Sequence, residues 1–234
     1  GRGRVSEIVS IVGVNWTTRG RLGECLRSVE AHGEGAETIV VDNGSSDGSV
    51  GMVREEFPWV RVMVNERNEG YAKANNQGIR ASEGRYVLLL NSDARLTQEA
   101  TGEMVRCMEE DERVGICGPR LIYPNGGEQF SCGNLPSLWG EIRSAFGGKE
   151  EVGLFRFTRN GGLLRFARND KPQYPIPHAT DQEHNPWEVG MVSGASMMVR
   201  WKMLDEVGML DERFFMFSEE VDLCKRAWEG GWKV

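Results

Sequence analysis

The chain has 234 residues, of which 39% are hydrophobic and 27% charged, which suits one large globular domain or one domain carrying an insertion. Its formal net charge of -7 argues against a nucleic-acid partner, because such partners usually require a basic face. The sequence contains no apolar run of membrane-spanning length and no opening pattern typical of a signal peptide. Since the five cysteines show no Cys-x-x-Cys spacing, we expect buried thiols in a reducing cytoplasm.

Apolar runs alternate with helical patterns through the first half of the chain. The runs predict strands over 7–14, 38–41, 60–64, 86–90 and 114–123. Helices are predicted between them, through Leu22 to Val29, up to Val53, over 72–81, and from a cap at Thr97 to Glu109. This alternation predicts an α/β fold with a mostly parallel, doubly wound sheet.

The pattern decays after Tyr123 and returns only near the end of the chain. Residues 124–188 are rich in Gly and Pro without a period, so we interpret them as a variable insertion. An ordered run follows over 189–200, then a short helix over 201–207. Ser218 is the expected N-cap of a last helix, which ends at the glycines 230–231.

The apolar run 86–90 leads directly into Asn91-Ser92-Asp93. Ligands of open α/β sheets lie outside the carboxyl ends of such strands. Two oxygen-bearing side chains one residue apart can face a hard cation such as Mg²⁺ or Mn²⁺. The alternative is a strand followed by an Asx-turn, with Asp93 closing the loop.

Five segments together resemble glycosyltransferase family 2, whose members are inverting enzymes with the GT-A fold. They are VSIVGVNWT, VVDNGSSDGS, NEGYAKANNQGI, YVLLLNSDARL and the run from VSGASMMVR to EEVDLCKRAWEGGW, and they cover most of 5–123 and 189–234. The NSD, NNQGI and MLDERFFMF stretches resemble rhamnosyltransferase-like bacterial members.

The resemblance implies a single GT-A domain over 1–234, a Rossmann-like α/β sheet with an insertion. Residues 5–123 would form the nucleotide-sugar-binding half, 124–188 the variable insertion, and 189–234 the acceptor and catalytic half. The last of these is expected to be truncated at its C-terminus, because family members often supply a later histidine.

The resemblance also assigns the donor contacts. Two of them have a plainer alternative, which is turn capping for Asp42 and an Asx-turn for Asn15. At the position of Asn75 many family members carry Arg, so the neutral side chain here departs from a direct charge contact with phosphate. The residues that match donor-binding positions of the family are Asn15, Asp42, Asn68, Gly70, Asn75 and Asn91.

Asp93 matches the metal-binding end of the family's Asp-x-Asp motif, and Asn91 replaces the first Asp. A divalent metal, Mg²⁺ or Mn²⁺, would neutralise charge on the pyrophosphate as it leaves. The neutral Asn91 weakens such a site electrostatically.

Glu219 and Glu220 match the family's Glu-Asp pair, whose second member usually supplies the general base. Glu220 is therefore the expected base, with Glu219 beside it and Asp222 in support. The alternative is that all three acidic side chains simply stabilise the helix dipole.

These residues together predict an inverting transfer of a sugar from a dTDP- or UDP-sugar to a hydroxyl of a cell-surface glycan or lipid-linked acceptor. Rhamnose is the first expectation for the sugar. We expect a cytoplasmic protein, with peripheral association at the inner face of the plasma membrane left open. Two other functions stay open, a sugar nucleotidyltransferase and a catalytically degenerate nucleotide-sugar-binding protein.

Overall fold

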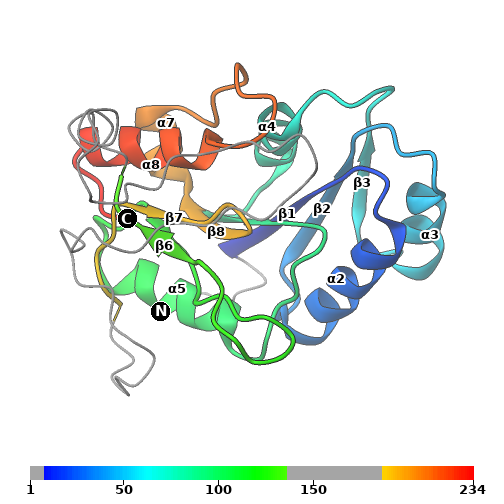
Figure 1. Cartoon of the computed structure of the whole chain (residues 1–234), viewed down its shortest axis with the longest axis horizontal. Helices are drawn as coiled ribbons and strands as arrows, with labels where there is room; N and C mark the ends of the chain where they lie inside the picture. The colour runs from blue at the N-terminus through cyan, green and yellow to red at the C-terminus, as the bar shows by residue number, and fades with distance from the viewer. Residues whose placement is uncertain (1–7, 136–185) are drawn as a thin grey trace, which may run out of the picture.

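A computed structural model describes residues 8–135 and 186–234, and one twisted sheet organises this part of the chain (Figure 1). The sheet runs in the order β3 (Arg61–Val64), β2 (Glu37–Asp42), β1 (Val9–Asn15), β4 (Tyr86–Leu90), β8 (Ser196–Arg200) and β5 (Ile116–Cys117). The neighbours among β3, β2, β1 and β4 pair in parallel, and β8 is antiparallel to both β4 and β5. The predicted mostly parallel α/β sheet is confirmed.

Helices cover both faces of the sheet. One face packs against α2 (Arg19–His32), α3 (Ser49–Glu56) and α5 (Ala100–Glu110). The other packs against α4 (Tyr71–Ala81), α7 (Trp201–Val207) and α8 (Glu219–Glu229). This is the doubly wound arrangement, and it leaves the carboxyl ends of β1, β2 and β4 together at one edge of the sheet.

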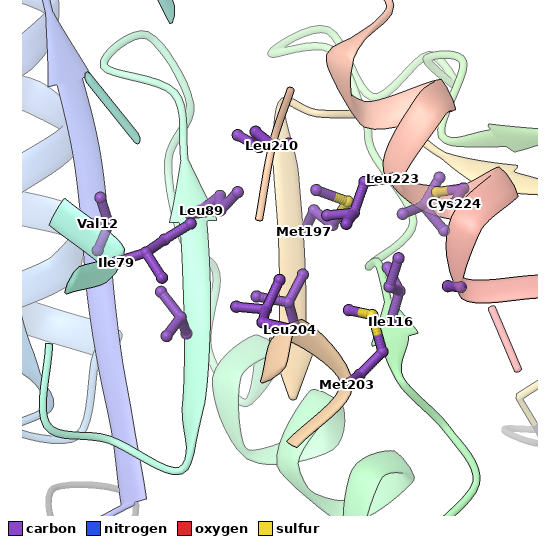
Figure 2. Packing of buried hydrophobic residues seen from close by; sticks show 14 of the residues in the cluster. Val12, Ile79, Leu89, Ile116, Met197, Met203, Leu204, Leu210, Leu223 and Cys224 are labelled. Atoms are coloured by element: carbon purple, nitrogen blue, oxygen red, sulfur yellow. The ribbon is translucent and has the colours of Figure 1, made fainter. Parts of the chain in front are cut away.

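Strands β1, β2, β4 and β8 are buried on both faces because alternate side chains enter different clusters, whereas the edge strand β3 is partly exposed. Val87 and Leu89 of β4 face α4 and α7, whereas Leu88 faces α2 and α5. Figure 2 shows Leu89 close to Ile79 of α4 on that first face. Each side chain of this size stabilises the fold by roughly 1.5–3 kcal/mol when fully buried.

The predicted strand over 114–123 is much shorter in the structure. Only Ile116–Cys117 pairs with β8, and isolated bridges join Val114 to Lys233 and Ile122 to Glu128. Gly118 and Pro119 follow directly, and a proline has no N–H for a ladder. Within the described residues the sheet pairing therefore ends at Cys117.

One predicted helix start is wrong, and another is at the expected position but lacks the expected capping bond. Helix α5 begins at Ala100 after Glu99, which has a left-handed backbone (φ 65°), so the expected cap at Thr97 is wrong. Ser218 does precede α8, but at φ 74° its side chain makes no capping bond within the described chain. A capping serine normally has extended backbone angles.

Part of the expected insertion joins the ordered structure. Cys132–Gly133 forms β6, which pairs with β7 (Met191–Val192) in a small antiparallel sheet. A strand of two residues is too short to show a period. The rest of the insertion, residues 136–185, lies outside the described residues.

All five cysteines are free thiols, of which Cys25 and Cys224 are buried and the other three partly buried. Among the helices in the described part of the chain, none has the length and apolar character needed to cross a bilayer.

Candidate active site at the carboxyl edge of the sheet

Asn15 and Asp42 lie opposite each other at the ends of β1 and β2, and both are buried. Asn15 Nδ2 donates to Asp42 Oδ2 (2.7 Å) and to Ser45 Oγ (3.0 Å), and Asn15 Oδ1 accepts from Thr18 Oγ1 (2.7 Å). Asp42 Oδ1 accepts from the backbone N–H of Ser45 (2.8 Å). The two predicted donor residues are thus adjacent, and both also hold the turns that follow their strands. A carboxylate has about four lone-pair sites, so Asp42 retains unused lone pairs, although the residue is 1% exposed.

Asn68 and Gly70 lie beside the end of β2, held there by a residue that the sequence analysis missed. Asn43 Nδ2 donates to Asn68 Oδ1 and to the carbonyl oxygen of Gly70, both at 3.2 Å. Asn68 Oδ1 also accepts from the N–H of Gly70 (2.9 Å). The only signal for Asn43 is its place directly after Asp42.

Gly70 brings the segment before α8 against the start of α4. Its φ is +91°, and a Cβ there would lie 2.9 Å from the carbonyl oxygen of Phe215. Only glycine fits this backbone and this contact without strain. The predicted donor-side glycine therefore also contacts the exposed aromatic loop that precedes Glu219.

Asn75 is almost fully buried in α4, and its Nδ2 donates to the carbonyl oxygen of Tyr71 (3.0 Å). Its Oδ1 has no hydrogen-bond partner among the described residues. Buried polar atoms are nearly always satisfied, so this oxygen has the capacity for one donor from a ligand or a water.

Asn91 and Asp93 follow β4 and have different partners. Asn91 Oδ1 accepts from the phenol of Tyr71 (2.6 Å). Asp93 is about half exposed, and its Oδ2 lies 3.5 Å from Nη1 of Arg21. An exposed pair of this kind contributes at most about 1 kcal/mol, so Asp93 can exchange this partner for another cation.

The donor set at Asp93 fits a metal that arrives with a diphosphate. In the described part of the chain no three His, Cys, Asp or Glu side chains gather into a ready-made metal cage. Mg²⁺ is commonly held by one or two carboxylates together with phosphate oxygens and waters. Asp93 supplies one accessible carboxylate for such a site.

Glu219 and Glu220 open α8 and are both withdrawn from water. Glu219 is 4% exposed, and each residue has an Oε2 that is buried without a hydrogen-bond partner among the described residues. Burial, and then the charge of Glu220, raises the pKa of Glu219 to about 7. Burial also raises the pKa of Glu220. Helix-dipole stabilisation alone does not require burial, and carboxylates with raised pKa values are candidates for acid–base groups.

One side chain links this pair to the end of β4. The phenol of Tyr71 contacts both Asn91 Oδ1 and the carbonyl oxygen of Gly194 (3.2 Å). A Cβ on Gly194 would lie 3.6 Å from Cβ, Cγ and Cδ of Glu220. Neither Tyr71 nor Gly194 was predicted, because a tyrosine at a helix start and a glycine between strands are ordinary in sequence.

Asp222 points to a different set of partners. Its Oδ2 pairs with Nε of Arg226 (2.8 Å), and Arg226 donates to the carbonyl oxygens of Val207 (2.6 Å) and Met209 (2.8 Å). Asp222 thus helps to join α8 to the end of α7. The contact is structural, and the supporting catalytic role expected for Asp222 stays a prediction.

Comparison with solved structures identifies the fold. A mannosyltransferase from Pyrobaculum calidifontis, in complex with GDP-Man and Mn²⁺, matches 96% of the chain with a TM-score of 0.62 and 16% identity. S. aureus TarS, residues 1–349, matches 94% with a TM-score of 0.59 and 16% identity. The chain spans 53% and 55% of those two proteins. The fold is that of the GT-A glycosyltransferases.

Sequence comparison then gives the family. The profile described as glycosyl transferase family 2 matches residues 10–208, so the chain belongs to glycosyltransferase family 2. An N-acetylglucosaminyl-diphospho-decaprenol L-rhamnosyltransferase of Mycobacterium tuberculosis is 28% identical over 97% of the chain and 73% of the relative. A low-salt glycan biosynthesis hexosyltransferase of Haloferax volcanii is 27% identical over 82% of the chain and 53% of the relative.

Proposed function

We propose that the protein is an inverting glycosyltransferase that moves a sugar from a nucleotide-sugar donor to a hydroxyl of a cell-surface glycan or a lipid-linked saccharide. The observation that carries this proposal is the meeting of two kinds of group at one edge of the sheet. The phenol of Tyr71 lies 2.6 Å from Asn91 Oδ1, two residues before the metal-type residue Asp93, and 3.2 Å from the carbonyl oxygen of Gly194. A Cβ on Gly194 would in turn lie 3.6 Å from the side chain of Glu220, which follows the buried Glu219. A donor-side cation ligand and an acceptor-side base are both needed for this reaction.

Glu220 is the proposed general base. Its carboxylate accepts the proton of the acceptor hydroxyl while the hydroxyl oxygen forms a bond to the anomeric carbon. The bond from that carbon to the diphosphate breaks, and the electron pair leaves with the diphosphate. Attack opposite the leaving group inverts the anomeric configuration. The raised pKa of Glu220 makes it a better proton acceptor than an ordinary carboxylate.

The donor lies, in this proposal, along the ends of β1, β2 and β4. Asn15 and Asp42 face its nucleoside, while Asn68, Gly70, Asn75 and Asn91 line its diphosphate and sugar. A divalent cation held by Asp93 would supply charge neutralisation for the departing diphosphate.

Rhamnose from a dTDP donor is the proposed sugar, supported by the mycobacterial relative and by the NSD and NNQGI stretches. The acceptor class rests on the same relative, whose name specifies a saccharide on a diphospho-polyprenol.

A donor panel tests the function. The protein would be incubated with dTDP-rhamnose and with UDP- and GDP-sugars, a short-chain polyprenyl diphosphate N-acetylglucosamine acceptor, and Mg²⁺ or Mn²⁺. We expect a product heavier by one sugar, release of the free nucleotide, and an inverted anomeric configuration by NMR. Nucleotide-sugar binding without release or transfer across the panel would instead support the degenerate binding protein.

A further inference from the structure

The phenol of Tyr71 lies between two acceptors at the junction of the donor and acceptor sides. Tyr71 opens α4, and its hydroxyl is 2.6 Å from Asn91 Oδ1 and 3.2 Å from the carbonyl oxygen of Gly194. A phenol has one proton, so the shorter contact takes the stronger share of the hydrogen bond. The distance of 2.6 Å is typical of O–H···O and short for N–H···O, which identifies the amide oxygen of Asn91 as the atom that faces the phenol.

The environment keeps this phenol protonated, and therefore a donor. Burial raises the pKa of Tyr71, a hydrogen bond with Asn75 opposes this, and the charges of Glu219, Glu220 and Asp93 raise it again. A protonated phenol selects an oxygen acceptor, so the amide of Asn91 has one preferred orientation.

That orientation determines what Asn91 presents to a ligand. With Oδ1 held by Tyr71, the two N–H groups of Nδ2 are on the opposite side of the amide. Within residues 8–135 and 186–234 no protein group accepts a hydrogen bond from Asn91 Nδ2, and the residue is only partly buried. An anionic oxygen is the natural partner for such donors.

We propose that Tyr71 is a positioning residue that turns Asn91 so that its Nδ2 donates to the anionic diphosphate of the nucleotide-sugar donor. This inference rests on the proposed function and refines it. It also accounts for asparagine in the NSD stretch, because a carboxylate at position 91 would repel the diphosphate and add a negative charge near Glu219, Glu220 and Asp93.

A double-mutant cycle tests the inference through binding rather than turnover. The dissociation constants of UDP- and dTDP-sugars would be measured by calorimetry with Mg²⁺ for the parent, Tyr71→Phe, Asn91→Ala and the double variant. Loss of an outer residue that orients a ligand-binding group costs about ten- to a hundred-fold in affinity or activity. We expect that loss in Tyr71→Phe, a similar loss in Asn91→Ala, and no further loss when Tyr71→Phe is added to Asn91→Ala.

Tyr86→Phe is the matched control. Tyr86 is buried where Tyr71 is partly buried, and its phenol likewise donates to a side chain, Glu109, on the α5 side of the sheet away from the candidate site. We expect this variant to bind nucleotide sugars as the parent does, even if its melting temperature falls as far as that of Tyr71→Phe.

Two results would overturn the positioning role. One is binding by Tyr71→Phe or by Asn91→Ala within two-fold of the parent. The other is an undiminished effect of Tyr71→Phe in the Asn91→Ala background, which would indicate general damage. A parent that binds a nucleotide sugar but never transfers it would contradict the proposed function alone, since the binding cycle would still report on Tyr71. A parent that binds no nucleotide sugar would contradict both.

Discussion

The side-chain amide of Asn76 pairs with both backbone groups of Leu210. Asn76 Nδ2 donates to the Leu210 carbonyl oxygen (2.8 Å), and the Leu210 N–H donates to Asn76 Oδ1 (3.1 Å). Asn76 is 1% exposed, so this reciprocal pair replaces water on both backbone groups. It joins α4 to the segment that leads into α8.

Asn76→Ala should therefore destabilise the fold. Each buried donor or acceptor left unsatisfied costs about 1–3 kcal/mol, and the substitution leaves two such groups on Leu210, so a loss of about 2–6 kcal/mol is expected in urea unfolding. Gln77→Ala is the control. Gln77 is the next residue along α4, and its side-chain amide is only partly buried and accepts one hydrogen bond, from Asn65 (2.8 Å). Equal losses in the free energy of unfolding of the two variants would show that the hydrogen bonds between Asn76 and Leu210 add no particular stability.

Asp93→Ala should abolish the metal-dependent part of donor binding. Asp93 is the only carboxylate in the NSD stretch, so its removal takes away the protein's acidic ligand there. Calorimetric titration of a UDP- or dTDP-sugar, with and without Mn²⁺, measures the difference. Glu24→Ala is a close control, since its side chain is 52% exposed against 53% for Asp93 and also pairs with an arginine. If Asp93→Ala kept the parent's metal-dependent affinity, the assignment would be wrong.

Glu220→Gln should lose transfer and keep donor affinity. A general base is worth about 10² to 10⁴ in rate, while it contacts the acceptor rather than the nucleotide. Glu220→Asp, which restores the residue usual in the family, should retain activity. Initial rates and dissociation constants would be compared with those of Glu219→Gln and Asp222→Asn. Parental rates in Glu220→Gln, with Glu219→Gln inactive, would move the base by one position along α8.

Glu219 should make the fold less stable as the pH rises. Its pKa is about 7 in the folded protein and near the ordinary 4.5 in the unfolded chain, so the folded state holds a proton that the unfolded state has released. The resulting loss in the free energy of unfolding is absent below about pH 4.5 and grows until about pH 7. It amounts to about 1.4 kcal/mol for each unit of pKa difference.

When the pH is raised from 5 to 8, the stability of Glu219→Gln should therefore fall less than the stability of the parent. The urea midpoint of each protein at each pH measures this difference. Glu229→Gln serves as the control, because Glu229 lies on the same helix with a side chain that is 64% exposed. If Glu219→Gln lost stability with rising pH as the parent does, the buried carboxylate of Glu219 would not be the cause of that loss.

The parallel part of the fold could be predicted because β1, β2 and β4 are apolar runs that end at a polar residue. Those end residues, Asn15, Asp42 and Asn91, then meet at one edge, as parallel strands require. The sequence could not show that β8 runs antiparallel between β4 and β5. A five-residue apolar run reads the same in either direction.

The links within the site were less predictable than its members. Tyr71 bonds to Asn91 and Gly194, which lie in distant segments, and no local period records such contacts. Asp42 would be needed at the end of β2 both to hold the turn that follows and to contact the nucleotide-sugar donor as proposed. Sequence alone therefore leaves both open.

The position of β8 has a consequence for how the protein is made. Strand β4 pairs with β1 on one side and with β8 on the other, and β5 reaches the sheet only through β8. During synthesis, a chain that has emerged as far as Leu135 would already contain β1 to β6, with β4 still an unpaired hydrophobic edge. Such edges promote association between chains, and closing a contact between distant segments is slow. The late arrival of residues 196–200 is thus the step at which we expect folding to be most vulnerable to aggregation and most dependent on chaperones.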